Sequence, residues 1–266
     1  MIHYINANDN TDQVYWFPLR VSYDRSIAVA RELEGMDIPP YDGEEEGESE
    51  CYFLPRKTIT VHFDENDREF YYDETAEPTI NADGKEEKKR KRIGQHKYFT
   101  ISDHSQITHE DTKNNMKFKI VSKPLLSNLI FIRTTKSRLQ ELRHDNPTMS
   151  AVNFMSYISH SDLTGNMSTI ERNSLRRIIT LTHRDIHDFH AIISEYNRDV
   201  TILDFDKLKS HFGKRIRIIN GPLAGQEGIV RRIKGNKKIH FEIGDLLTIQ
   251  VDYIPNRMYE LIDEGQ

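Results

Sequence analysis

The sequence predicts an α+β fold: an antiparallel four-stranded sheet with helices packed on one face, followed by a small, separate β-domain near the C-terminal end. Three stretches carry this prediction. They are an aromatic strand near the start, a densely apolar strand in the middle, and two short strands around a glycine-rich turn near the end. A chain of 266 residues is long enough to bury two cores, so two domains are expected.

The first stretch, residues 14–21, is rich in aromatic and β-branched side chains and is predicted to be a strand. Pro18 has no N–H for a ladder hydrogen bond, so this strand is expected to lie at a sheet edge or to bulge there. Ser26 is expected to cap a helix that runs to about Glu34, because apolar residues recur at helical spacing and Gly35 stands where a stop belongs.

The next part of the chain is less regular. Residues 51–55 and 59–63 are strand-like, whereas residues 64 to about 117 are predicted to be an insertion. The run of charges at residues 84–92 is expected to form a mobile hairpin tip or a disordered loop. A basic tip of this kind offers a contact to nucleic acid, although exposed charge without a partner is the more common outcome.

Regular structure is predicted again from residue 123 onward. Residues 129–132 are all apolar, as expected of a central strand buried on both sides. Thr135 or Ser137 is expected to start a helix through Leu142, and residues 152–158 and 177–181 are strand candidates. The sequence from Thr182 to Asp185 is a variant of the capping box, which predicts a helix through about Glu195.

The C-terminal part begins with a predicted linker at residues 197–208 that contains a short strand at 200–203. In the segment that follows, isoleucines alternate with Arg215 and Arg217, a period of two that is typical of a half-buried strand. Asn220-Gly221-Pro222 ends that strand, and Gly225 and Gly228 let the chain turn back into a second strand.

Charge is unevenly distributed around a net charge of −5. Residues 42–50 contain six acids and no base, whereas residues 207–238 contain ten lysines or arginines and a single acid, Glu227. The basic segment indicates an anionic partner, and strand faces exposed to solvent explain it equally well.

Composition limits the possible classes of protein. The single cysteine, Cys51, excludes an internal disulfide and disfavours a cysteine-based zinc site. Apolar runs stay well below the roughly 18 residues of a membrane span, and the first residues lack a secretory pattern. A cytoplasmic protein with no membrane partner is therefore expected.

The strand–turn–strand segment at residues 213–230 resembles the KOW motif of small SH3-like barrels in transcription factors of the NusG family and in ribosomal proteins. The resemblance extends toward the N-terminus. Trp16-Phe-Pro-Leu-Arg20 looks like the opening strand of the NGN domain of that family, and Phe53-Leu-Pro55 resembles its second strand. Residues 124–132 and 179–182 resemble two later NGN segments.

The resemblance implies an NGN-like domain at residues 1–196, interrupted by the insertion, then the linker, then a five-stranded KOW barrel at residues 209–266. Ser127-Asn128 stands where the family usually has Pro-Gly, and Leu126 and Leu129 replace aromatic residues. These departures suggest a specialised paralogue similar to the UpxY-like antiterminators of Bacteroides-type bacteria.

The function implied is that of a transcription elongation or antitermination factor that suppresses pausing or termination. A concavity on the NGN sheet would receive the clamp helices of the RNA polymerase largest subunit, and the residues expected to line it are Trp16, Phe17, Leu125, Leu126 and Leu129. For Trp16 and Leu129, packing in the core is nearly as good an explanation.

The KOW domain would contact a small-subunit ribosomal protein or the termination factor Rho. The residues expected there are Gly221, Pro222, Leu223, Gly225, Ile229 and Phe241. Nucleic acid in the elongation complex would be contacted by Arg215, Arg217, Arg231 and Arg232. The alternative function is an RNA- or ribosome-binding KOW module that acts without RNA polymerase.

Enzymatic chemistry is not expected. His183, His187 and His190 lie at helical spacing that suits a metal site, but an exposed polar flank is the better interpretation. We find no nucleophile motif of the G-x-S-x-G kind and no phosphate-binding P-loop. The protein is therefore expected to need no metal or cofactor.

Overall fold

The structure is a computed structural model. It describes residues 3–6, 12–22, 25–43, 50–66, 68–72, 79–81, 85–87, 90–92, 109–111, 116–159, 162, 167–197, 200–203, 213–221, 223–233, 236–244, 246–251, 254 and 256–262. The fold is α+β, as predicted, with mostly antiparallel sheets and few helices. The chain divides into two compact units: unit 1 comprises Met1–Pro55 and Leu126–Gln266, and unit 2 comprises Arg56–Leu125. Within the described ranges, no helix is long and apolar enough to cross a membrane.

The central sheet of unit 1 has four antiparallel strands in the order β12-β2-β11-β3. They are β12 (Asn153–Phe154), β2 (Val14–Arg20), β11 (Leu129–Thr135) and β3 (Cys51–Phe53). Because β11 lies between β2 and β3 and its first four residues are buried, the predicted central strand at 129–132 is confirmed.

Pro18 lies in an internal strand, so the expected edge position is wrong. Its carbonyl accepts a hydrogen bond from the Met155 N–H at 3.3 Å, just past the end of the two-residue strand β12. Since N–H and C=O of one residue point to the same side of an antiparallel strand, the missing N–H of Pro18 faces the point where β12 has ended. The ladder therefore loses little at this proline.

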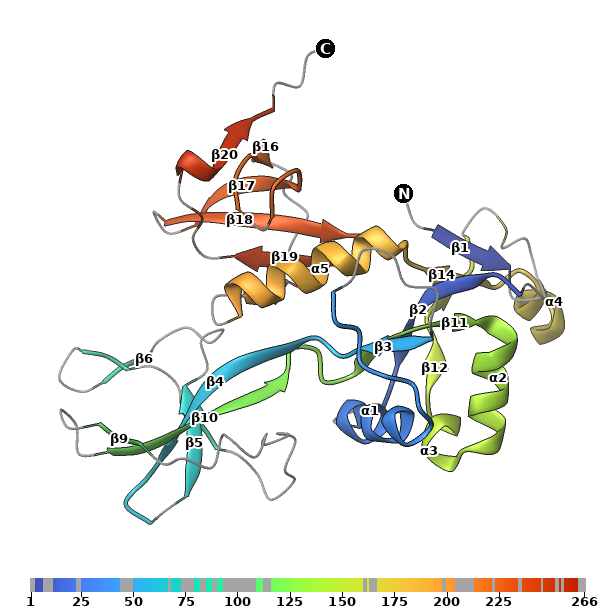
Figure 1. The fold of residues 1–266 in the computed structure, drawn as a ribbon, viewed down its shortest axis with the longest axis horizontal. Helices are drawn as coiled ribbons and strands as arrows, with labels where there is room; N and C mark the ends of the chain where they lie inside the picture. Colours follow the sequence, from blue (N-terminus) through green and yellow to red (C-terminus); the bar gives the residue numbers. More distant parts are fainter. Residues whose placement is uncertain are drawn as a thin grey trace. The chain divides into compact units, whose positions relative to one another are not determined.

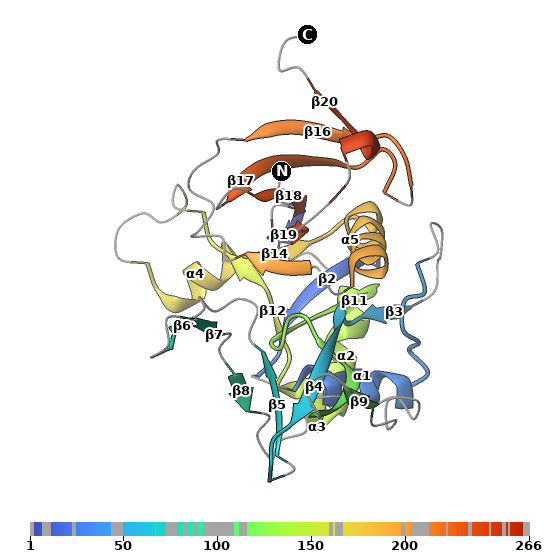
Figure 2. The same cartoon turned by 90° about the vertical axis from the view of Figure 1, so that its left-hand side faces the viewer.

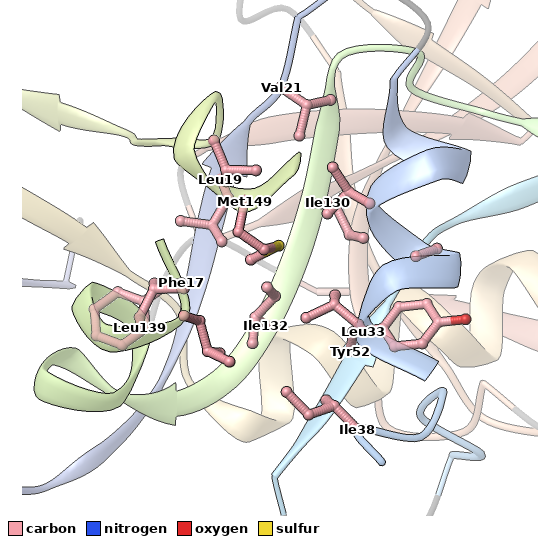
Figure 3. Packing of buried hydrophobic residues seen from close by; sticks show 14 of the residues in the cluster. Phe17, Leu19, Val21, Leu33, Ile38, Tyr52, Ile130, Ile132, Leu139 and Met149 are labelled. Carbon is pink, nitrogen blue, oxygen red and sulfur yellow. The ribbon is translucent and has the colours of Figure 1, made fainter. Parts of the chain in front are cut away.

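One face of the central sheet is covered by three helices, α1 (Ser26–Gly35), α2 (Lys136–Asp145) and α3 (Pro147–Ser150). Figure 3 shows how their side chains meet those of the strands, with Leu33, Leu139 and Met149 packed against Phe17, Leu19, Ile130 and Ile132. Full burial of each such side chain is worth roughly 1.5–3 kcal/mol, so this layer supplies much of the driving force for folding unit 1.

The other face of the sheet is covered by α5 (His183–Tyr196), which lies opposite α1, α2 and α3 in Figure 1. The ring of Phe189 lies edge-on to Phe53 and to Phe131, with centroid distances of 5.3 and 5.8 Å. The prediction of helices on one face is therefore wrong, because a strand that is apolar on both sides needs a cover on each.

A second small sheet of unit 1 has the order β1-β14-β13. Its strands are β1 (His3–Asn6), β14 (Arg177–Thr180) and β13 (Ser156–Tyr157), and α4 (Thr169–Ser174) precedes β14. The single strand expected at residues 152–158 is instead split between two sheets. Met155 marks the division, because its N–H donates to Pro18 and its carbonyl accepts from the Ile179 N–H.

Helix starts follow the predictions in two cases out of three. Thr182 and Asp185 form both hydrogen bonds of the capping box at the start of α5, and Thr135 caps α2 through the Arg138 N–H. The prediction that Ser26 caps α1 is wrong, because Ser26 is the first helical residue, is buried, and follows Arg25 at the cap position.

The C-terminal part of unit 1 is one antiparallel sheet of six strands in the order β15-β19-β18-β17-β16-β20, seen from the side in Figure 2. The strands are β15 (Val200–Leu203), β16 (Lys214–Ile218), β17 (Glu227–Ile233), β18 (Asn236–Ile243), β19 (Leu247–Val251) and β20 (Tyr259–Leu261), with the 3-10 turn η4 (Asn256–Met258) before the last. The expected linker strand at 200–203 is β15, which pairs with β19 and so belongs to this sheet. The rest of the expected linker lies mostly outside the described residues.

Unit 2 contains a five-stranded antiparallel sheet in the order β8-β5-β4-β10-β9 and a separate two-stranded pair. The strands are β4 (Arg56–Phe63), β5 (Glu69–Tyr72), β8 (Arg90–Arg92), β9 (His109–Asp111) and β10 (Met116–Pro124), and the pair is β6 (Thr79–Ile80) with β7 (Glu86–Glu87). This unit encloses the insertion predicted at 64–117. The expected loop at 84–92 is wrong for β7 and β8, and residues 84, 88 and 89 lie outside the described residues.

Candidate functional site

The apolar residues expected to face RNA polymerase do not form one exposed patch. Trp16 and Phe17 are only 1% and 0% exposed and point to opposite faces of the sheet, and Leu129 is 9% exposed. Leu125 and Leu126 are half-buried in the turn between β10 and β11. Core packing therefore accounts for the three buried residues, and Leu126 is the member of the set in unit 1 that presents surface.

A layer of rings covers the Trp16 side of the sheet. Tyr41 lies edge-on to Trp16 at 5.4 Å between centroids, and it also contacts His183 and His190 at 5.6 and 5.4 Å. Gly43 closes this layer with a φ of +97°, and a Cβ there would lie 2.7 Å from His190 Cε1. Only glycine fits, so the segment before β3 is held directly against α5.

The histidines of α5 take part in this layer and are not the exposed flank that the sequence suggests. The Trp16 indole Nε1–H donates to His183 Nδ1 at 3.2 Å, and His190 packs edge-on to Phe53. Burial lowers the pKa of His190, and the neighbouring His187 lowers it further. Among the described residues, no group of three His, Cys, Asp or Glu side chains is arranged to hold a metal ion.

The glycine-rich turn of the C-terminal sheet is closely hydrogen-bonded. Gly221 and Gly225 have φ values of +87° and +88°, which agrees with the turn chemistry expected of glycine. The Gly225 N–H donates to the Ile218 carbonyl at 2.7 Å, and the Ala224 N–H donates to Gly221 at 3.0 Å. The turn is therefore a preformed feature of this sheet.

The apolar residues expected at this turn lie mainly beneath it. Leu223 and Phe241 are buried, Ile229 is half-buried, and Pro222 lies outside the described residues. The large apolar side chains that are exposed nearby are Ile219, at 44%, and Leu261, at 54%. Sequence reasoning missed both, although Ile219 breaks the alternation of β16 and so signals an outward-facing position.

The basic residues of this sheet are partly neutralised. Arg215 and Arg217 each donate to Glu227 at 2.8 Å, one to each carboxylate oxygen. The hydrogen bond from Arg217 is the main cause that lowers the pKa of Glu227, so the carboxylate stays ionised. Arg231 and Arg232 belong to β17, but their side chains lie outside the described residues.

The C-terminal sheet contacts α5 at two points. Gln226 Nε2 donates to Asp188 Oδ1 at 3.2 Å, and burial raises the pKa of that carboxyl. A Cβ on Gly244, whose φ is +53°, would lie 2.2 Å from Leu181 Cδ2. Sequence alone left open whether the two parts of unit 1 touch, and these contacts place the C-terminal sheet against the second helical layer.

Cys51 is buried in β3, and burial raises the pKa of its thiol to about 11. The thiolate is the nucleophilic form, so this side chain is inert at neutral pH. Its position fits packing and not catalysis.

No known protein-family model matches the chain, and no curated protein matches it either.

Proposed function

We propose that the protein is a NusG-like transcription elongation or antitermination factor, possessing an NGN-like domain in unit 1 followed by a KOW-like C-terminal sheet. The observation that carries the proposal is the order of elements in unit 1. An opening strand with Trp16 is followed by a helix, a strand, a central strand beside the first, and a further helix. A small sheet with a glycine turn ends the chain, as the resemblance implies.

The polymerase contact is assigned to the surface around Leu126. Leu126 is half-buried, in the turn just before the central strand β11, and presents apolar surface. Trp16, Phe17 and Leu129 support that strand from within, so they shape the surface instead of making the contact. A clamp helix docked there would gain its affinity from a few apolar anchors.

The second partner is assigned to the preformed turn at Gly221–Gly225 and the exposed side chains of Ile219 and Leu261. A small-subunit ribosomal protein or Rho is the class of partner that the resemblance implies. The alternative, a module that binds RNA through Arg215 and Arg217, is weakened because both guanidinium groups are already paired with Glu227.

A pull-down with bacterial RNA polymerase core tests the proposal, with Leu126→Glu compared against wild type. A carboxylate buried without a partner costs several kcal/mol by rough estimate, so the variant is expected to lose binding. Ile170→Glu on α4 is the matched control, because Ile170 is 82% exposed and is expected to tolerate the same charge.

Far-UV circular dichroism establishes that both variants are folded. If wild-type protein does not bind polymerase, or if Leu126→Glu binds as well as the control, the proposed interface is wrong. Retention of RNA by a protein that ignores polymerase would favour the RNA-binding alternative, and that binding should weaken steeply with added salt.

A further inference from the structure

Unit 2 presents a row of aromatic rings across three strands of its sheet. Phe118 on β10 lies opposite His62 on β4, and His62 lies opposite Phe70 on β5. Residues directly opposite in antiparallel strands project from the same face, so these three rings share one side of the sheet. Figure 1 shows β4 and β10 as the two long strands that run side by side.

The rings form one contiguous group. His62 stacks on Phe70 with a centroid distance of 5.5 Å and an interplanar angle of 27°. Tyr72, two residues along β5 on the same face, lies 5.2 Å from His62 and 5.6 Å from Phe70. Phe70 is 4% exposed and anchors the group, whereas His62, Tyr72 and Phe118 are only half-buried and offer ring surface.

Positive charge accompanies this face. Arg90 is exposed and its guanidinium lies over the Phe70 ring at 5.0 Å, at the β8 side of the row. Arg56 shares the face at the start of β4, about 20 Å from His62 at the usual strand rise. The two long strands together contain Arg56, Lys57, Lys117, Lys119 and Lys123 but no acidic residue. A negatively charged ligand is therefore favoured.

Hydroxyl groups occupy the space between the rings and Arg56. Thr58 lies directly opposite Ser122, and Thr60 lies between Thr58 and His62 on the same face. The opposite face differs, since its central residues Val61 and Val121 are buried. The aromatic face thus combines ring surfaces, arginines and hydroxyls on the more open side of the sheet.

We propose that this face of unit 2 binds single-stranded RNA, with bases stacked on His62, Tyr72 and Phe118 and phosphates held by Arg90 and Arg56. Aromatic rings accept any base on a π-face, and arginines follow the backbone, which is how sheets bind single strands. The hydroxyls of Thr60 and Ser122 are placed to contact ribose 2′-OH groups, which favours RNA over DNA. This inference does not depend on binding to polymerase.

Fluorescence anisotropy of the full chain with a fluorescein-labelled RNA of about ten nucleotides and mixed sequence tests the proposal. Phe118→Leu keeps apolar volume but removes a stacking ring, and it is expected to weaken binding about tenfold, whereas Phe118→Trp is expected to retain binding. Arg90→Gln is expected to weaken binding and to reduce the salt slope by about one.

Lys117→Gln is the matched control for charge, because Lys117 is exposed on β10 but projects from the opposite face. It removes the same charge as Arg90→Gln and is expected to bind RNA nearly as wild type. Equal losses in the two variants would indicate general attraction and would overturn the proposed face.

Three further outcomes decide the proposal. Wild-type protein that does not bind the RNA at about 100 mM salt overturns it. DNA of the same sequence bound as tightly as RNA overturns the assignment to RNA. Unchanged binding in both Phe118→Leu and Arg90→Gln also overturns it, and Arg90, being exposed, can be replaced with little risk to folding. Loss of RNA binding with intact polymerase binding separates this site from the proposed function.

Discussion

The indole N–H of Trp16 donates to Nδ1 of His183, at 3.2 Å, across 167 residues of sequence. This bond joins β2 to the first residue of α5, and Trp16 is 1% exposed beneath that helix. The second helical layer is thus tied to the central sheet by a polar contact as well as by aromatic packing. Its loss should be measurable, because a buried donor left without a partner loses the hydration that it would have when unfolded.

Replacing His183 with alanine should lower the free energy of unfolding by about 1–3 kcal/mol, since the indole N–H then lacks its acceptor. Urea denaturation followed by tryptophan fluorescence measures this directly, because Trp16 is the single tryptophan of the chain. His144→Ala is the control, as His144 is exposed on α2 and should change stability little. Equal effects of both substitutions would contradict a structural role for the bond.

Thr182→Ala should destabilise unit 1 by about 1 kcal/mol, since Thr182 caps α5 by accepting the Asp185 N–H and by donating to the Asp185 carboxylate. Thr182→Ser keeps the hydroxyl and should recover most of that loss. The midpoint of urea unfolding distinguishes the two variants. A serine variant as unstable as the alanine variant would show that the threonine methyl, and not the cap, carries the effect.

Gly244→Ala should be more costly than Gly225→Ala, although both glycines have positive φ. At Gly225 a Cβ meets no atom within 4 Å, so only backbone strain of about 1 kcal/mol is expected. At Gly244 the Cβ would lie 2.2 Å from Leu181 Cδ2, and Leu181 is buried. The clash should add about 1–2 kcal/mol, measured by urea unfolding. Equal costs would argue against the packing of the C-terminal sheet on the residue before α5.

Stability should fall as the pH is lowered from about 7 to below 6, in part because of His190. Burial lowers its pKa in the folded protein, whereas the unfolded side chain titrates near 6.5. Below that value the unfolded chain binds a proton that the folded chain does not, so protonation favours unfolding. His190→Gln should flatten this part of the profile, and His144→Gln should not. A profile unchanged by His190→Gln would refute this contribution.

Which parts of the fold were predictable follows from what each signal depends on. The central strand, the capped start of α5 and the glycine turn depend on local chemistry, and all three are confirmed. The second helical layer was missed because no local pattern states which face of a strand a distant helix will cover. The run of Tyr15, Trp16 and Phe17 has no polar residue to mark an outer face. A cover on both sides was therefore implied by that run without being located.

The candidate site shows the same division. The sequence singled out Trp16 and Phe17 by type, but it could not tell that α5, Tyr41 and the core remove them from the surface. The aromatic face of unit 2 was missed because His62, Phe70 and Phe118 meet through strand register, and that register is set by pairing across more than fifty residues. Tertiary pairing, and not residue type, determines both outcomes.

Cys51 should resist alkylation by iodoacetamide in the folded protein at pH 8 and react fully in urea. Burial raises its thiol pKa to about 11, so only about one molecule in a thousand would carry the thiolate at that pH, and steric access is also restricted. An unfolded thiol has a pKa near 8.5 and reacts readily. Mass spectrometry of the labelled chain gives the rate in both states. Rapid labelling without urea would show that β3 opens on the timescale of the reaction, and it would contradict the tight cover that α5 is described to form. Leu126→Glu should leave this rate unchanged, because the proposed polymerase contact lies outside the layer that protects Cys51.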